Sequence, residues 1–438
     1  MAETNRSARN TALDNLRVVA MLLGLVTHGV LPFKATALGR YPIRDAHTSI
    51  LADAAYFAVH DFRMQLFFLV AGFAAAALAA RRGLRELVRN RLARIVLPLL
   101  LAVTLIAPLM RVLFTYHEVD RVTDGSIPPL AVWKELHLLD WLGPNFHLWF
   151  LYYLVLCSMA LAGWLAFGPP ALSARAIETA DRGFRWFFGR WWKTPVLAAT
   201  AIPLLWTMPD WWIDTPQGWQ PEPVTLLYYL GFFLFGAMLF RHADLLPGYG
   251  RRWLMQLAVA NLVVLPLMLK LTVSGNWAED RMGSHVPGWL IGWKAAAIFF
   301  GGLYTWLMVE GLVGLFQRHF AGTRTWWRYL VGASYWCYLA GFPVQVALQV
   351  WLAEHPMPIV VKFVLVNAVS FAVLLASYEL LVRRSWVGAM LNGRKAEPKP
   401  EPVVVAVRVK VGAPAADPHW VRQPAVSETA ERTPAPSA

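Results

Sequence analysis

The sequence is poor in cysteine and in charged residues. Cys157 and Cys337 are its only cysteines, and both lie inside apolar runs. Neither a disulfide framework nor a cysteine-based metal site is therefore expected, and we predict no metal site. Charged residues make up 15% of the chain, against about 25% in ordinary soluble domains. This composition excludes a disulfide-stabilised secreted domain and differs from that of a soluble enzyme.

Apolar residues are abundant instead and make up 57% of the 438 residues. They gather in runs of about membrane-spanning length. We therefore predict an all-α polytopic membrane protein of about ten transmembrane helices. The predicted helices cover residues 13–33, 56–80, 93–115, 147–167, 194–208, 224–240, 253–272, 289–314, 329–352 and 357–382. The fifth is the weakest, because it is short and contains Pro195 and Pro203.

Lysine and arginine are distributed unevenly over the predicted loops. The loops on the N-terminal side of the membrane hold 19 of these residues, and those on the other side hold 6. Because basic residues favour the cytoplasmic side, both termini are predicted to be cytoplasmic. The same rule accounts for the net charge of +13 without a nucleic-acid partner.

The composition changes after Arg383 and Arg384, where Pro, Ala, Val and Glu become frequent. Such a segment cannot bury a core. We predict a transmembrane domain over residues 1–393 and a disordered, Pro/Ala-rich cytoplasmic tail over residues 394–438.

The outward loops at 116–146, 209–223 and 273–288 combine acidic residues with tryptophan or histidine. Aromatic faces beside carboxylates suit a sugar-binding rim. Tryptophan at the membrane interface, with solvated acids, is an equally good interpretation.

A stripe of polar and small residues follows one face of the first predicted helix. At roughly 100° per residue, the steps from Arg17 to His28 return to nearly the same azimuth, about 16 Å further along the axis. Asp14, Met21 and Gly24 share that face. Ionisable groups in a bilayer are costly, so the stripe should face the bundle interior. Gly24 leaves room for a narrow group; the alternative is a helix-end anchor with a satisfied histidine.

A second basic feature precedes the third predicted helix, where Arg89, Arg91 and Arg94 lie close together. Guanidinium groups at a helix N-terminus suit a phosphate-rich ligand, although such residues also anchor helices at the cytoplasmic face. Arg17 enters the membrane from the same side and His28 lies deeper. A donor with a phosphate head and a long, thin reactive arm would fit this path, and coenzyme A thioesters have that shape.

Histidine suits the chemistry of acyl transfer from a thioester. Attack of a sugar hydroxyl on a thioester needs a base with a pKa near neutrality and then an acid for the departing thiolate. His28 could be that base. Asp14 is about 21 Å away along the axis and cannot orient it. The orienting partner must come from another helix, and the candidates, each equally compatible with an interfacial role, are His60, Asp61, Arg63 and His147.

Other polar groups in the predicted helices are expected to be structural. Glu310 should lie near the cytoplasmic face and pair with a loop arginine. Gln345 and Gln349 lie four residues apart and should bond across helices or line a cavity,.

The chain resembles the family-3 membrane acyltransferases over about residues 10–382. Their signature is similar to Leu13-Asp14-Asn15-Leu16-Arg17, followed by ten residues and His28. Their Arg-x-x-Arg motif is similar to Arg91-Leu-Ala-Arg94. The stretch 62–73, with His147-Leu148-Trp149, is more similar to the glucans biosynthesis protein C branch, whose members are taken to succinylate periplasmic glucans.

The resemblance implies ten helices in the bacterial inner membrane and an O-acyltransferase activity. It implies acyl-CoA (succinyl-CoA or acetyl-CoA) as a cytoplasmic co-substrate, no permanently bound cofactor, and a periplasmic or extracytoplasmic glycan as acceptor. His28 would be catalytic, and Arg17, Arg91 and Arg94 would bind the donor. Supporting roles are expected for Asp14, His60, Asp61, Arg63, His147 and Trp149.

Two positions depart from the family pattern. Ala71 stands where a serine is usual before the glycine of the second helix, and Gly341 stands where a related segment commonly has histidine. A role of the serine hydroxyl or of that histidine in related proteins therefore cannot apply to this chain.

Two other functions remain open from the sequence. Ten helices with buried charge also suit a glycan or lipid transporter or flippase, although the chain has no visible inverted repeat of the kind that many transporters show. A non-catalytic partner of a glycan-export system is the other alternative. The expected partners are acyl-CoA, the glycan and the lipid bilayer, with no nucleic acid, and a homo-oligomer is also compatible with the sequence.

Overall fold

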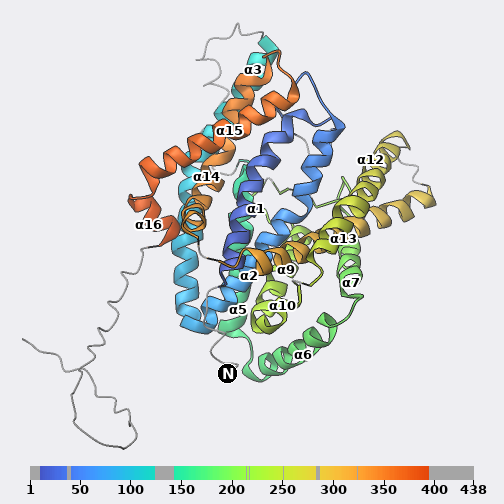
Figure 1. Cartoon of the computed structure of the whole chain (residues 1–438), viewed down its shortest axis with the longest axis vertical. Helices are drawn as coiled ribbons and strands as arrows, with labels where there is room; N and C mark the ends of the chain where they lie inside the picture. Colours follow the sequence, from blue (N-terminus) through green and yellow to red (C-terminus); the bar gives the residue numbers. More distant parts are fainter. Residues whose placement is uncertain are drawn as a thin grey trace, which may run out of the picture. The chain divides into compact units, whose positions relative to one another are not determined.

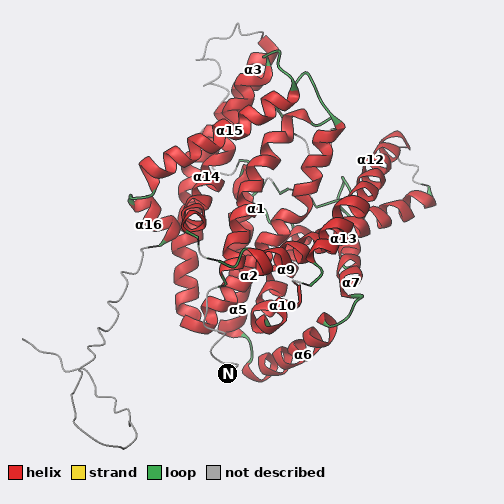
Figure 2. Ribbon diagram, in the orientation of Figure 1, coloured by secondary structure: helices red, strands yellow, loops and turns green. Residues whose placement is uncertain are grey.

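The structure is a computed structural model that describes residues 10–36, 41–123, 143–213, 215–216, 218–249, 251–282, 287–322 and 324–393. These residues form helices and their connections (Figures 1 and 2), and the one β-type contact among them is an isolated bridge between Lys34 and Ser49. The tail predicted over residues 394–438 lies outside the described residues.

In chain order the helices and helical turns are α1 (Thr11–Val30), η2 (Leu31–Phe33), α2 (Ile50–Arg91), η3 (Leu92–Val96), α3 (Leu97–Thr123), η4 (Phe146–Leu148), α5 (Trp149–Phe167), α6 (Pro170–Phe188), α7 (Lys193–Ala199), α8 (Ala201–Leu205), α9 (Pro223–Arg241), η5 (Ala243–Leu245), α10 (Leu246–Tyr249), α11 (Trp253–Val259), η6 (Ala260–Val264), α12 (Leu265–Met282), α13 (Gly288–His319), α14 (Thr325–Ala353), α15 (Ile359–Ser377), η7 (Tyr378–Val382) and α16 (Trp386–Asn392).

Eight helical segments of the described chain are long and apolar enough to cross a membrane. One of them, Ile50–Glu118, has 69 residues and contains the second and third predicted helices, because α2 continues through the π-helical turn η3 into α3. Gly83 breaks the helical path within α2 with a φ of +78°, a conformation that glycine adopts readily,. The protein is therefore a multi-pass membrane protein, and the all-α prediction is confirmed.

The fifth predicted helix is not among the eight segments, because it forms the two short helices α7 and α8. Thr194 at the start of α7 donates to Glu310 Oε2 at 3.2 Å. Just beyond α8, the ring centroid of Trp206 lies 5.9 Å from Lys294 Nζ. Glu310 and Lys294 are about 24 Å apart along α13, so α7 and α8 together follow about half of that helix.

Two hydrogen bonds show that α1 and α14 run parallel. Gln345 Nε2 donates to the Leu25 carbonyl at 2.8 Å, and Gln349 Nε2 donates to the His28 carbonyl, also at 2.8 Å. The two glutamines therefore bond across helices, as expected. The helices α1 and α14 correspond to the first and ninth of the ten predicted passes, which should cross the membrane in the same direction, and parallel packing agrees with this. The cytoplasmic placement of the termini stays a prediction.

Two glycines bring α2 and α9 into close contact. A Cβ at Gly72 would lie 1.8 Å from the Phe233 carbonyl oxygen, and one at Gly236 would lie 1.9 Å from that of Leu69. Only a residue without a side chain allows this approach of two helix backbones in a membrane. The contact fixes α2, which carries several of the predicted site residues.

The buried carboxylate of Glu310 is fully hydrogen-bonded. Its Oε1 accepts from Lys193 Nζ at 2.7 Å, its Oε2 accepts from Gln256 Nε2 at 2.6 Å, and the Thr194 hydroxyl reaches both oxygens. The prediction that Glu310 pairs with a loop arginine is therefore wrong. Lys193 takes that place because α7 begins at the level of Glu310 along α13.

Candidate active site

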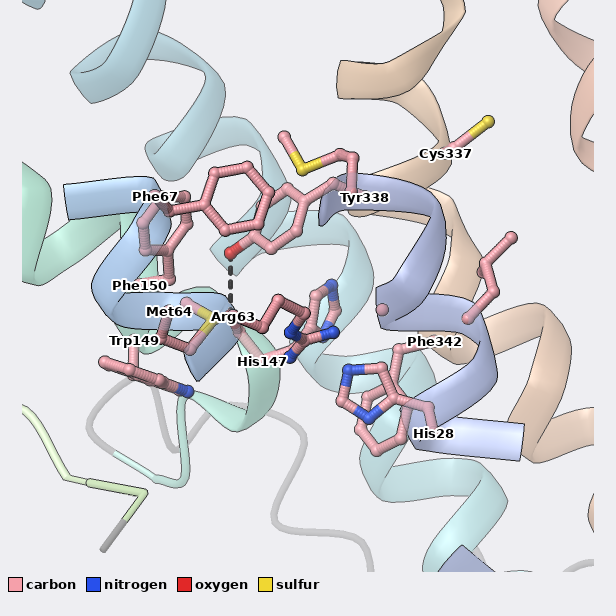
Figure 3. Close-up of a pocket in the computed structure, with 13 residues that line it drawn as sticks. His28, Arg63, Met64, Phe67, His147, Trp149, Phe150, Cys337, Tyr338 and Phe342 are labelled. Atoms are coloured by element: carbon pink, nitrogen blue, oxygen red, sulfur yellow. Dashed lines mark hydrogen bonds between the residues drawn. The ribbon is translucent and has the colours of Figure 1, made fainter. Parts of the chain in front are cut away.

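A cavity lies between four helical segments, α1, α2, α14 and the η4–α5 region (Figure 3). It is lined by Met21, Gly24, Leu25, His28, Arg63, Met64, Phe67, His147, Trp149, Phe150, Cys337, Tyr338 and Phe342. Met21, Gly24 and His28 belong to the stripe predicted on the first helix, so this part of the stripe faces the bundle interior. The cavity also brings in Arg63, His147 and Trp149 from the predicted supporting residues.

His28 occupies the last turn of α1 and is fixed from two sides. Its ring packs against Phe342 with centroids 4.4 Å apart, and its carbonyl accepts the hydrogen bond from Gln349. The Nδ1 atom is buried and has no hydrogen-bond partner within the described part of the chain. A held imidazole with an unsatisfied nitrogen is suited to exchange a proton with a ligand.

Arg63 fills the space beside Gly24. A Cβ at Gly24 would lie only 2.5 Å from Arg63 Nη1, so a side chain there would have to displace the guanidinium. The narrow group that we expected along this face is therefore a guanidinium of the protein itself. Arg63 is 9% exposed, and its Nε is buried without a partner in the residues that the structure covers.

His147 enters the cavity from η4. The preceding residue, Phe146, has a φ of +48°, which is unfavourable for an aromatic residue. His147 Nε2 lies 3.1 Å from the Leu339 carbonyl, and the His147 carbonyl accepts from the Tyr338 hydroxyl at 2.7 Å, the bond drawn in Figure 3. Its Nδ1 is buried and has no partner among the described residues.

Three of the predicted supporting residues do not line the cavity. His60 stacks on Tyr56 with ring centroids 4.8 Å apart. The Asp61 backbone accepts from the Thr305 hydroxyl at 2.6 Å, so this part of α2 faces α13. Asp14 lies in the first turn of α1, far from His28. On this turn of α2, His60 and Asp61 face other helices, whereas Arg63 faces α1.

The predicted donor-side arginines form a cluster near the start of α1. Arg91 lies within electrostatic range of both Arg17 and Arg94, and the Tyr335 hydroxyl donates to the Arg94 carbonyl at 2.8 Å. Arg91 Nε and Nη2 are buried without partners in the described ranges. Three like charges in one place favour an anionic ligand. Arg17 and His28 are about 16 Å apart along α1, so the cluster and the cavity lie along one helix.

Sequence reasoning missed the contribution of α14. Tyr338 and Phe342 line the cavity, and Tyr335 contacts the arginine cluster. The signal was the stretch 334–343, which resembles a family segment, but its aromatic side chains are indistinguishable by pattern from lipid-facing ones. Across the described ranges, no three His, Cys, Asp or Glu side chains are grouped to hold a metal.

Known proteins are similar to this chain over most of its length. A family model described as an acyltransferase domain matches residues 10–378. Glucans biosynthesis protein C of Salmonella schwarzengrund (strain CVM19633) and that of Salmonella typhi are each 24% identical over 401 residues, which are 88% of this chain and 95% of theirs. The protein of that name from Salmonella heidelberg (strain SL476) is 24% identical over 396 residues, with the same coverage. No solved structure matches.

Proposed function

The chain belongs to the acyltransferase domain family, and it is an acyltransferase; from this premise we propose that it is an O-acyltransferase of the bacterial inner membrane. It moves an acyl group, succinyl or acetyl, from cytoplasmic acyl-CoA to a hydroxyl of a periplasmic glycan. The glycan class follows from the name of its relatives, glucans biosynthesis protein C. A glucan is therefore the acceptor that we propose.

The observation that carries the proposal is the set of unsatisfied polar atoms around one cavity. His28 Nδ1, Arg63 Nε and His147 Nδ1 are all buried, and none has a partner in the described part of the chain. Each unmade hydrogen bond in the interior costs about 1–3 kcal/mol. This cost is compensated when a polar substrate occupies the cavity.

The arginine cluster supports a phosphate-bearing donor. Arg91, with Arg17 and Arg94 beside it, would hold the phosphate groups of acyl-CoA by charge-assisted hydrogen bonds. The thin arm of the donor would then extend along α1 toward Met21 and the cavity. The thioester carbonyl would lie near His28 and Arg63.

The transfer step needs one base and one positive charge. His28 accepts the proton of the acceptor hydroxyl while the hydroxyl oxygen bonds to the thioester carbonyl carbon. The carbonyl oxygen becomes negative, and the Arg63 guanidinium stabilises it. The C–S bond then breaks, and the His28 imidazolium returns its proton to the thiolate. The products are an ester and free coenzyme A, so protons and electrons balance.

The test uses the purified protein with labelled acetyl-CoA or succinyl-CoA and a glucan extract. We expect one free thiol for each ester formed on the glucan. Free thiol with no ester on the glucan would contradict the proposed acceptor. An intact thioester with no ester formed would contradict acyl transfer from CoA and favour a carrier.

A further inference from the structure

The cavity contains a second histidine that the transfer step above does not use. His147 Nε2 lies 3.1 Å from the Leu339 carbonyl oxygen. Because a carbonyl oxygen only accepts, Nε2 carries a proton, and in the neutral ring Nδ1 keeps its lone pair. The ring is therefore held as a hydrogen-bond acceptor at the cavity, and no described residue donates to it.

The backbone before His147 is strained, and this argues against a packing role alone. Phe146 has a φ of +48°, and such conformations cost about 1–3 kcal/mol and concentrate at functional sites. The Tyr338 hydroxyl fixes the carbonyl of His147 from α14. The strained turn and the bond from Tyr338 together set the direction from which the imidazole enters the cavity.

A hydroxyl is a ligand group that fits His147 and Arg63 together. His147 Nδ1 needs a donor, and Arg63 Nε needs an acceptor. A carboxylate or a carbonyl would satisfy only Arg63. An ammonium group would satisfy only His147 and would be repelled by Arg63. A hydroxyl donates one hydrogen bond and accepts another.

The two histidines line the same cavity and lie against the same aromatic ring. The Phe342 ring contacts His28 at 4.4 Å and His147 at 5.3 Å between centroids. A ring whose first hydroxyl meets His28 can therefore present another hydroxyl to His147.

We propose that His147 Nδ1 and Arg63 Nε bind a second hydroxyl of the sugar ring that is acylated. The acceptor class is thereby narrowed to rings with at least two free hydroxyls, and His147 is a specificity-determining residue. This inference rests on the proposed function, because it assumes that His28 meets the reacting hydroxyl.

The experiment compares methyl β-D-glucopyranoside with its monodeoxy analogues as acceptors of labelled acyl-CoA. The analogue that lacks the acylated hydroxyl cannot react. One further analogue should lose at least about 100-fold in kcat/KM, because it leaves buried polar groups unpaired. The inference is overturned if every analogue that retains the acylated hydroxyl reacts within threefold of the parent.

Two variants of His147 separate substrate binding from structural support. In His147→Asn the amide oxygen reaches about as far as Nδ1, so the discrimination against the second analogue should persist. In His147→Gln the amide reaches about as far as Nε2 and can keep the bond to Leu339, yet the discrimination should vanish. The opposite pattern would mean that His147 acts through Leu339 alone. His60→Gln, a buried histidine of α2 outside the cavity, is the matched control and should retain the discrimination.

The outcomes also distinguish this inference from the proposed function. Transfer to a glucan, with every analogue that retains the acylated hydroxyl reacting within threefold of the parent glucoside, overturns the inference alone. Loss of transfer to both acceptors overturns the proposed function and, with it, the inference.

Discussion

Two buried polar clusters of the bundle differ in how their hydrogen bonds are satisfied. Around Glu310, a carboxylate that is 1% exposed, Lys193, Thr194 and Gln256 bond to both oxygens. Around the cavity, nitrogen atoms of His28, Arg63 and His147 are equally buried and have no partner in the described ranges. Both clusters place charge or polarity inside a membrane protein, where it is costly.

The difference separates structural from functional polarity. In a satisfied cluster, hydrogen bonds within the folded protein offset the free energy of desolvation, so removing one member should lower stability. In an unsatisfied cluster, that free energy is offset only by hydrogen bonds to a bound ligand, so removing one member should lower activity. The two clusters therefore predict opposite results for stability and turnover.

The largest expected effect is that of His28→Ala. Loss of the base should lower acyl transfer by about a thousandfold or more, within the range of general acid–base catalysis. The melting temperature in detergent should fall only by what the packing of the ring on Phe342 contributes, because Nδ1 has no hydrogen bond to lose in the described part of the chain. Label transfer and thermal melting would be measured on the same preparation. His319→Ala, at an exposed position, is the control, and equal activity of both variants would remove His28 from the mechanism.

Glu310→Ala should give the reverse pattern. It leaves Lys193 and Gln256 without their partner, and breaking a buried ion pair costs about 3–5 kcal/mol. Turnover per folded molecule should be unchanged. Unfolding and activity would be measured together, and the milder Glu310→Gln serves if the alanine variant does not fold. A stable but inactive Glu310→Gln would erase the distinction between the two clusters.

Gly24→Ala tests the placement of Arg63. The added Cβ would come within 2.5 Å of Arg63 Nη1 and must displace the guanidinium. We expect kcat to fall by about 10- to 100-fold, a part of what a single oxyanion donor contributes. Gly231→Ala on α9, where nothing lies within 4 Å of the added carbon, should have no such effect. Similar kcat values in the two variants would show that the position of Arg63 does not matter.

Arg91→Ala should weaken donor binding with a smaller effect. Loss of one charge-assisted phosphate contact corresponds to about a tenfold rise in the KM for acyl-CoA. The rise should shrink at high salt, because salt screens the phosphate contacts of the wild type. Arg89→Ala, whose guanidinium pairs with Glu86 at 2.8 Å on the exposed surface, is the control. A KM for acyl-CoA in Arg91→Ala equal to that of the wild type at every salt concentration would identify Arg91 as a membrane anchor.

The smallest effect is expected outside the membrane-spanning segments, at Asp181. Its carboxyl accepts from Arg241 Nε at 3.0 Å, and this bond lowers the pKa of Asp181 below its ordinary value. The ionised carboxyl therefore stabilises the fold at neutral pH, and this contribution is lost as the pH falls below about 4. Asp181→Asn should cost at most about 1 kcal/mol at pH 7. Melting curves of the variant and the wild type should converge at low pH; a constant difference would assign the effect to packing.

Much of the fold could be predicted from hydrophobic length alone. The helical class and the span positions follow from apolar runs that must satisfy their backbone within a bilayer. The fifth run was ambiguous for a physical reason: it forms two short helices, α7 and α8, that follow α13 together. Only tertiary contacts could show this.

The site was predictable where it depended on one helix and unpredictable where it depended on two. The azimuth of Met21, Gly24 and His28 follows from helix geometry. The partner beside Gly24 could not be deduced, because it comes from α2. From the sequence, His60, Asp61 and Arg63 were equally good candidates for the site. Only the packing of α2 against α1 and α13 shows that Arg63 alone of the three lies beside α1.

The most direct test places labelled acyl-CoA and a glucan on opposite sides of sealed proteoliposomes that contain the wild type or His28→Ala. The wild type should form labelled ester on the glucan and release free coenzyme A on the donor side, and His28→Ala should form none. Intact acyl-CoA on the glucan side, or equal ester formation by both proteins, would contradict the assignment of this cavity to acyl transfer.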